Sequence, residues 1–166
     1  MASSAIPKTF RDGSISIADG TPTTPLSVSP QFEQGDFSAD GLEAEQYAVT
    51  AIEARGELVG LRKGARTYPT ISLTLLLTEF TDASGGDVLD MIHGRGTDYS
   101  ARVSTTTAKG DVITLDLTLT IEGTDLGDAG DHSVTFRDVH FTYAFAEAEA
   151  NTLSLSGTVY GDVEFS

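Results

Sequence analysis

The sequence contains no cysteine and no tryptophan, and only 10 of its 166 residues are lysine or arginine. The absence of cysteine excludes disulfides, thiolate metal sites and cysteine nucleophiles. Asp and Glu number 25, so the net charge is −15, and a surface this acidic repels phosphate backbones at close range. We therefore expect no tight binding to nucleic acid, although solubility alone would also explain such a charge.

Long apolar runs are missing as well. No stretch of about 18 apolar residues is present, so we expect no membrane-spanning helix. The first residues lack the apolar region of a signal peptide, and we expect none. Apolar residues still make up 39% of the chain, which is enough for one folded domain with a core. We expect residues 1–12 to form a flexible polar arm and residues 13–166 to form a single domain.

Patterns typical of catalysis and of metal binding are also missing. The three histidines do not lie near a serine in a G-x-S-x-G motif, so no base is placed beside a nucleophile. Asp125, Asp128 and Asp131 lie three apart in the loop TDLGDAGDH, and carboxylates in such a loop could bind Ca²⁺. Their spacing matches neither an EF-hand nor a glycine-rich β-helix repeat. We therefore expect no enzymatic activity, no cofactor and no required metal site.

The strongest positive signal is residues 111–122, DVITLDLTLTIE. Apolar side chains occupy every odd position from Ile113 to Ile121, and polar side chains occupy the even positions. Strict alternation predicts a half-buried strand with one solvent-exposed face. At its length of roughly 30 Å, it is the expected central strand of the fold.

Weaker alternation elsewhere indicates a mainly β domain, a two-sheet sandwich or open barrel. A turn is expected at Asp19-Gly20, and residues 31–46 read as an acidic loop anchored by Phe32 and Phe37. The apolar phase slips between Arg137 and Asp138, which predicts a β-bulge. The predicted strands cover residues 14–18, 26–29 at a proline-flanked edge, 47–55, 69–79, 99–104, 134–145 and 153–164.

One short helix is predicted at about residues 84–94. Ser84 is its expected N-cap, with Asp87 three residues later in a capping-box arrangement. Val88, Leu89 and Ile92 share one face, and Gly94 supplies the left-handed C-terminal cap. A helix of this length is too short to be stable alone, so it must pack on a sheet.

Basic residues are concentrated in one place. Residues 56–68, GELVGLRKGARTY, contain three glycines and read as a long hairpin loop between the strands 47–55 and 69–79. Arg55, Arg62, Lys63 and Arg66 place four of the ten basic residues within twelve positions. A solvated loop is the simple explanation. The alternative is an assembly contact in which these residues meet an acidic surface of another copy.

Four stretches, in this order, carry a resemblance to a known family: RGELVGLRKGARTYPTISLTLLLTEFTD, DVLDMIHGRG, DVITLDLTLTIEGTDLGDAGDHSVTFRDV and NTLSLSGTVYGDV. Together they resemble the tail tube proteins, or major tail proteins, of long-tailed, siphovirus-like bacteriophages. Each stretch alone is weakly specific. Their order of hairpin loop, amphipathic helix, long alternating strand, acidic loop and closing strands is more specific. The similarity runs from about Asp12 to Val163.

The resemblance implies a structural virion protein without enzymatic activity or cofactor. Six copies would form a ring, rings would stack into the tail tube, and one sheet of each subunit would line the lumen. The hairpin loop and the termini would reach adjacent subunits or rings. Partners would be further copies of the chain, the tape-measure protein, and tail-terminator and distal-tail proteins. DNA would pass through at ejection without tight binding, no membrane would take part, and assembly would occur in the host cytoplasm.

The solvent-exposed face of the central strand is the candidate lumen surface. Thr114, Asp116, Thr118 and Thr120 would point inward, because hydroxyls and carboxylates do not trap DNA as Lys and Arg would. A competing interpretation is a β-sandwich binding module, such as a capsid decoration protein or a carbohydrate-binding protein. Sugar sites are commonly lined by aromatic side chains, so the absence of tryptophan argues against the second of these but not the first.

Overall fold

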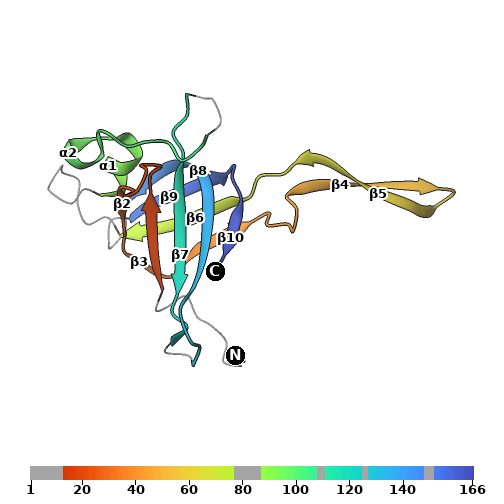
Figure 1. Cartoon of the computed structure of the whole chain (residues 1–166), viewed down its shortest axis with the longest axis horizontal. Helices are drawn as coiled ribbons and strands as arrows, with labels where there is room; N and C mark the ends of the chain where they lie inside the picture. Colours follow the sequence, from red (N-terminus) through yellow and green to blue (C-terminus); the bar gives the residue numbers. More distant parts are fainter. Residues whose placement is uncertain (1–12, 77–86, 108–110, 125–126, 148–151) are drawn as a thin grey trace.

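The computed structural model of the chain describes residues 13–76, 87–107, 111–124, 127–147 and 152–166. The expected flexible arm at residues 1–12 therefore lies outside the described part. The elements, shown in Figure 1, are β1 (Ser14–Ala18), β2 (Ser27–Val28), β3 (Phe32–Asp40), β4 (Tyr47–Ala54), β5 (Glu57–Arg66), β6 (Thr70–Leu76), α1 (Val88–His93), α2 (Gly96–Tyr99), β7 (Leu115–Ile121), β8 (His132–Ala146), β9 (Thr152–Val159) and β10 (Val163–Phe165).

The predicted mainly β sandwich is confirmed. Eight strands form one sheet in the order β2-β1-β7-β8-β9-β6-β3, with β10 also paired to β8. The long strand β8 joins two halves of this sheet, because its residues 132–139 pair with β7 and its residues 139–146 pair with β9. We call β2-β1-β7 with the start of β8 and β10 the first half-sheet. The end of β8 with β9, β6 and β3 is the second half-sheet.

The two half-sheets enclose the core. Leu117 of β7 and Leu73 and Leu155 of the second half-sheet are almost fully buried. The rings of Phe37 on β3 and Phe136 on β8 lie 5.9 Å apart across the interior. Alternating branched side chains on each strand thus form a single core between two polar outer faces.

The predicted bulge in β8 is confirmed. Leu115 pairs with Val139 but Leu117 pairs with Phe136, so one extra residue lies on β8. Asp138 has a positive φ of 53°. The Asp116 carboxylate accepts the Asp138 backbone N–H at 3.0 Å, which stabilises this uncommon conformation. The bulge turns β8 from one half-sheet into the other.

The central strand is shorter than its pattern predicted. β7 begins at Leu115, and Ile113 is 38% exposed in the segment before it. Thr114 is buried, and its hydroxyl interacts at 3.0 Å with the hydroxyls of Ser104 and Thr105. Thr114 therefore lies in an internal hydrogen-bond network, and the expectation that it lies on the solvent-exposed face of β7 is wrong.

The predicted helix is present as α1. Asp87 is its N-cap and accepts the backbone N–H of Asp90 at 3.0 Å, while Gly94 adopts the expected left-handed conformation. The prediction of Ser84 as the N-cap is therefore wrong, and Ser84 itself lies outside the described residues. Val88, Leu89 and Met91 are buried against the sheet. In the described part of the chain, no helix is long and apolar enough to cross a membrane.

Three local predictions are wrong for tertiary reasons. Within residues 31–46, expected to be a loop, lies the nine-residue edge strand β3, which pairs with β6. Residues 99–104, expected to be a strand, begin with Tyr99 at the end of the single helical turn α2, and residues 100–104 form no strand. No tight turn occurs at Asp19-Gly20, because the buried Asp19 carboxylate accepts the backbone N–H groups of Thr21, Leu26 and Val103 and holds a longer connection.

Candidate assembly surface

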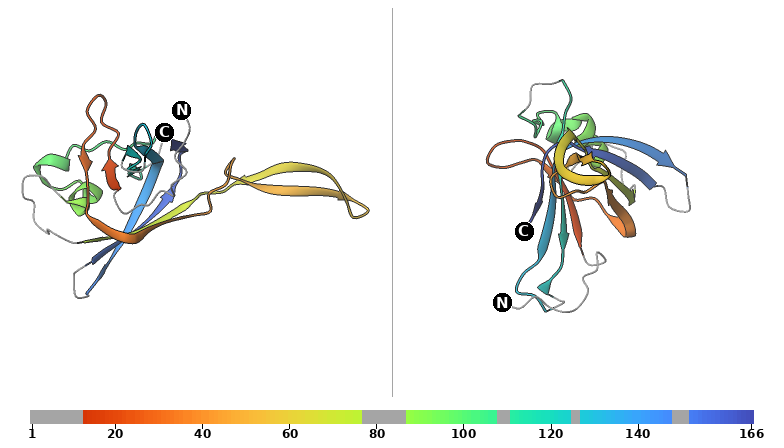
Figure 2. Two further views of the ribbon diagram at one scale, coloured as in Figure 1. Left: turned by 90° about the horizontal axis from the view of Figure 1, so that it is seen from below. Right: turned by 90° about the vertical axis from the view of Figure 1, so that its right-hand side faces the viewer.

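The basic segment belongs to a projecting β-hairpin, which we call the arm (residues 47–66). Strands β4 and β5 pair with each other in a sheet separate from the main one, and they extend far beyond the sandwich (Figures 1 and 2). The chain reverses at Arg55 and Gly56, both with positive φ, as in a two-residue hairpin turn. The prediction of a loop over residues 56–68 is thus wrong, since most of it is strand β5.

The arm exposes apolar side chains instead of burying them. No residue of β4 or β5 is buried. The register places Val49, Ala51, Leu58 and Leu61 on one face, together with Glu53 and Lys63. Val49, Leu58 and Leu61 are each 61–69% exposed. An isolated two-stranded hairpin is only marginally stable in water. An apolar face on such a projection is typical of a surface that another chain covers.

The structure separates the four basic residues into two groups. Lys63 contacts Glu45 at 2.6 Å, and Arg66 contacts Asp162 at 3.6 Å, so these two have partners within the chain near the root of the arm. The hydrogen bond to Glu45 raises the pKa of Lys63, but the pair is solvated and contributes little. Among the described residues, Arg55 and Arg62 have no acidic partner.

Contacts at the root fix how the arm leaves the sandwich. The backbone N–H of Thr67 donates to the carbonyl of Gln46 at 2.9 Å. The Tyr68 and Tyr160 rings lie 4.9 Å apart, and the Arg66 guanidinium donates to the Gly161 carbonyl at 3.3 Å. The arm is therefore anchored at the turn between β9 and β10.

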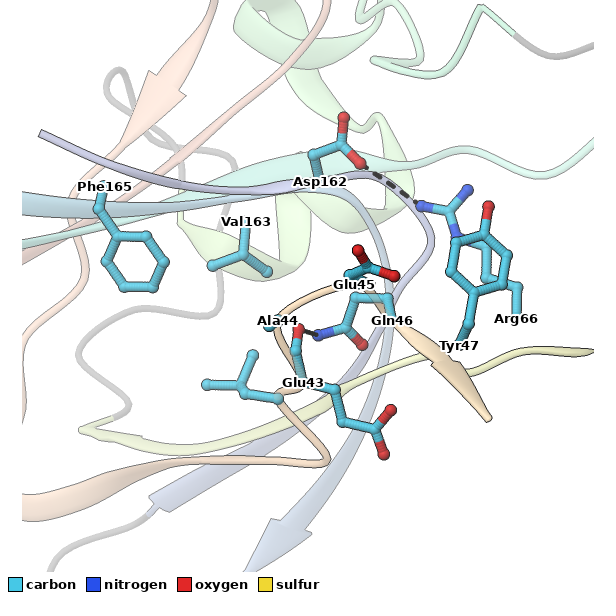
Figure 3. A pocket seen from close by; sticks show the side chains of 10 residues that line it. Glu43, Ala44, Glu45, Gln46, Tyr47, Arg66, Asp162, Val163 and Phe165 are labelled. Carbon is cyan, nitrogen blue, oxygen red and sulfur yellow. Dashed lines mark hydrogen bonds and ion pairs between the residues drawn. The ribbon is translucent and has the colours of Figure 1, made fainter. Parts of the chain in front are cut away.

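A groove lies at this root (Figure 3). It has a volume of about 520 Å³, and we call it the root groove. Its lining combines exposed apolar side chains with carboxylates. The lining residues are Leu42, Glu43, Ala44, Glu45, Gln46, Tyr47, Arg66, Asp162, Val163 and Phe165.

The second half-sheet has two long unpaired edges. β3 pairs with β6 alone, and residues 140–146 of β8 pair with β9 alone among the described residues. At the β8 edge, Tyr143 and Phe145 are 38% and 54% exposed. The first half-sheet instead ends in the two-residue strand β2 and the three-residue strand β10. Short edge strands resist pairing with other chains, whereas long ones favour it.

Both half-sheets present a polar outer face. On the first, Asp116, Thr118 and Thr120 are partly exposed. The Arg137 guanidinium donates to the carboxylates of Asp116 at 2.6 Å and Glu164 at 2.7 Å, which raises the pKa of Arg137. This face therefore carries a charged network.

The outer face of the second half-sheet is dominated by hydroxyls. The register of β6, β8 and β9 aligns serine and threonine side chains in rows across the three strands. The sequence pattern alone gave no indication of this alignment, because it depends on pairing between distant segments. The residues are Thr70, Ser72, Thr74, Thr142, Ser154, Ser156 and Thr158.

The described carboxylates of the acidic loop around residues 123–132 bond to groups of the same loop. Asp128 contacts His132 at 2.9 Å. Asp131 accepts the backbone N–H groups of Gly123 and Thr124, which lowers the pKa of Asp131. Asp125 lies outside the described residues. Within the described part, no group of three or more possible metal ligands occurs.

The described histidines lie in different surroundings, and His140 borders a pocket that Ser72 and Ser156 also line. His93, at the end of α1, hydrogen-bonds to the Tyr143 hydroxyl at 2.7 Å. His140 lies on β8 opposite Thr158. No described histidine hydrogen-bonds to a serine, so the arrangement needed for nucleophilic hydrolysis is not formed in this part of the chain.

No protein-family model and no curated protein sequence matches the chain. Solved structures do match over nearly its whole length. A chain of the PVC sheath/tube terminator of an extracellular contractile injection system has 13% identity and a TM-score of 0.57, with 97% of each chain covered. A chain of the PVC sheath-tube complex has 10% identity and a TM-score of 0.59, with 98% of this chain and 93% of that chain covered.

A third match is a chain of the six-fold symmetrised baseplate of the anti-feeding prophage, with 10% identity and a TM-score of 0.52. It covers 100% of this chain and 97% of that one. These matches are to structural components of phage-tail-like particles and not to enzymes. At such low identity the likeness concerns the fold, so the chain has the fold found in tube, terminator and baseplate assemblies of contractile injection systems.

Proposed function

We propose that this protein is the subunit of a tail tube, assembling into six-fold rings that stack. The observation that carries the proposal is the pair of long edges on the second half-sheet that no described strand covers, β3 on one side and residues 140–146 of β8 on the other. Pairing of β3 in one copy with β8 in the next satisfies both edges. Six copies of a four-stranded half-sheet then close a barrel without free edges.

The fold comparisons support a structural role in a tail. The matched chains come from a sheath/tube terminator, a sheath-tube complex and a six-fold symmetrised baseplate, and this chain covers almost all of each. The sequence resemblance points to the tubes of long-tailed phages, whereas these structures come from contractile particles. Both the resemblance and one of these structures involve a tube, and the proposal is limited to a tube subunit.

The structure favours a different lumen surface from the one suggested by the central strand. In a barrel closed through β3 and β8, the hydroxyl-rich outer face of the second half-sheet lines the channel. Its aligned side chains include no Lys or Arg, so no cation is placed to bind phosphate. The alternative lumen, formed by Asp116, Thr118 and Thr120, would place the Arg137 network in the channel and would leave the long edges unpaired.

In this function the protein's main partner is itself. Tape-measure protein would occupy the channel before ejection, DNA would follow without tight binding, and terminator and distal-tail proteins would cap the ends. The arm would connect neighbouring subunits or rings, with Arg55 and Arg62 available for contacts between copies. The protein would reside in the tail of the virion after assembly in the host cytoplasm.

Negative-stain microscopy of the purified protein across a concentration series tests the proposal. We expect rings or striated tubes above a threshold concentration. A second candidate, a decoration-type binding module, predicts compact particles of 17.5 kDa at every concentration. Sedimentation velocity on the same samples distinguishes the two, and a persistent monomer would contradict the tube proposal.

A further inference from the structure

We infer that the tip of the arm (residues 53–62) of one subunit docks in the root groove of a second copy. The inference rests on the proposed function and adds the acceptor site to it. It combines two surfaces of the same chain that cannot meet within one molecule. The arm extends away from the sandwich, and the groove lies where the arm begins (Figures 1 and 3).

Length supports contact between subunits. β4 contains eight residues, which at about 3.3 Å each places the tip roughly 26 Å from the root. The turn at Arg55 and Gly56 is narrow because only two residues connect the strands. A slender projection of this length can enter a groove on a neighbouring subunit.

The apolar surfaces match in character. At the tip, Leu58 and Val59 are 61% and 67% exposed. In the groove, Leu42 and Phe165 are 45% and 75% exposed, and Val163 also lines it. A volume of about 520 Å³ lies within the range of sites that bind drug-sized groups. Docking would remove both surfaces from water together.

The charges match as well. The arm contains four basic and two acidic residues, so its net charge is +2, while the rest of the chain carries −17. In the groove, Glu43 has no basic partner among the described residues, whereas Glu45 and Asp162 are already paired with Lys63 and Arg66. Glu43 is therefore the carboxylate available to Arg55 or Arg62 of a second copy.

Tip and groove are different surfaces of one chain, which determines the symmetry of the contact. A tip-to-groove interaction is heterologous, so each subunit donates one arm and accepts one arm. Such a contact continues around a ring or between stacked rings. Two arms pairing symmetrically would instead stop at a dimer.

Cysteine cross-linking tests this geometry, because the chain has no native cysteine. One protein would carry Leu58→Cys at the tip and another Leu42→Cys in the groove. A disulfide requires Cα atoms about 4.4–6.8 Å apart, so it reports direct contact. We expect the mixed pair to form disulfide-linked dimers at least about tenfold faster than either protein alone. Glu147→Cys, an exposed site at the end of β8, is the matched acceptor control.

A charge exchange provides an independent readout. Arg62→Glu and Glu43→Arg should each raise the threshold concentration for assembly, by about 1.4- to 5-fold per lost rim pair. Combining them in one chain should lower it again. Far-UV circular dichroism would verify that each variant is folded, and Asp111→Arg, at an exposed site in the segment before β7, is the control for a change of the same charge elsewhere.

The outcomes separate this inference from the proposed function. Rings that form normally while Leu58→Cys links to itself or to Glu147→Cys, and not to Leu42→Cys, would overturn the docking site alone. Failure of the wild-type chain to assemble at any concentration would overturn both.

Discussion

Removing the arm should abolish assembly without unfolding the sandwich. The variant replaces residues 48–65 with Asn-Gly, which suits a two-residue hairpin turn. It retains Tyr47 and Arg66, which lie opposite each other at the root. No residue of β4 or β5 is buried, so the deletion removes almost nothing from the core.

The expected cost can be bounded from the contacts that are lost. The Lys63–Glu45 pair is solvated and stabilises the fold only weakly. The contact of Lys63 with the Tyr47 ring at 5.2 Å is likewise exposed and weak. The free energy of unfolding should therefore fall by no more than about 2 kcal/mol, which is a Tm shift of no more than about 8 °C for a chain of this size.

Thermal unfolding followed by circular dichroism measures the fold, and sedimentation velocity measures assembly. Leu117→Ala is the comparison, since Leu117 is fully buried and its truncation should cost about 2–5 kcal/mol. A deletion variant as unstable as Leu117→Ala would show that the arm belongs to the folding unit. A stable deletion variant that still forms rings would refute the role of the arm in assembly.

Three further predictions concern the sandwich. Asp116→Ala should lower the free energy of urea unfolding by about 2 kcal/mol, because the bulge N–H of Asp138 and the Arg137 guanidinium lose their shared acceptor; an unchanged midpoint would contradict this. Burial raises the pKa of Asp19, but hydrogen bonds from Thr21, Val103 and Leu26 outweigh that effect and leave the pKa below its ordinary value. The ionised Asp19 carboxylate therefore stabilises the fold fully above about pH 4, and this stabilisation is lost as the pH falls through the lower folded-state pKa. Asp19→Asn should accordingly weaken the decrease in unfolding free energy between pH 7 and about pH 3. An unchanged decrease would refute the role of Asp19. Gly157→Ala should cost about 1–3 kcal/mol by overpacking, since its Cβ would lie 2.6 Å from Val139 Cγ1; calorimetry should show a lower Tm, and an unchanged one would mean that Val139 and Ile71 move aside easily.

Sequence periodicity predicted the elements whose alternation is set by burial on one side. Strands β7 and β6 and the bulge at Arg137–Asp138 could be predicted in this way, because their inward-facing residues are apolar and the pattern lies within one short segment. Gly94 likewise marks the C-terminal end of α1 as predicted, whereas the N-cap is Asp87 and not the predicted Ser84. These features depend on residues close together in the chain.

The errors occur where distant pairing determines the conformation. β3 has an acidic, loop-like sequence, and its pairing with β6 makes it a strand. Thr114 looks like part of an exposed polar row, but its partners Ser104 and Thr105 come from another segment. Local rules read only the residues themselves, so neither outcome could be predicted from them.

The candidate assembly surface was predicted only in part. The clustering of Arg55, Arg62, Lys63 and Arg66 was visible in the sequence. The partners of Lys63 and Arg66 were not, because Asp162 lies almost a hundred residues from Arg66. The root groove and the unpaired edges likewise arise only when the segments from Leu42 to Phe165 are brought together.

Cryo-electron microscopy of the assembled wild-type protein tests the central claim most directly. We predict six copies in each ring, β3 of one subunit hydrogen-bonded to residues 140–146 of β8 in the next, and a channel lined by Ser72, Ser156 and their neighbours. Rings in which these two edges remain unpaired, or a channel lined by Asp116 and Thr118, would contradict the account.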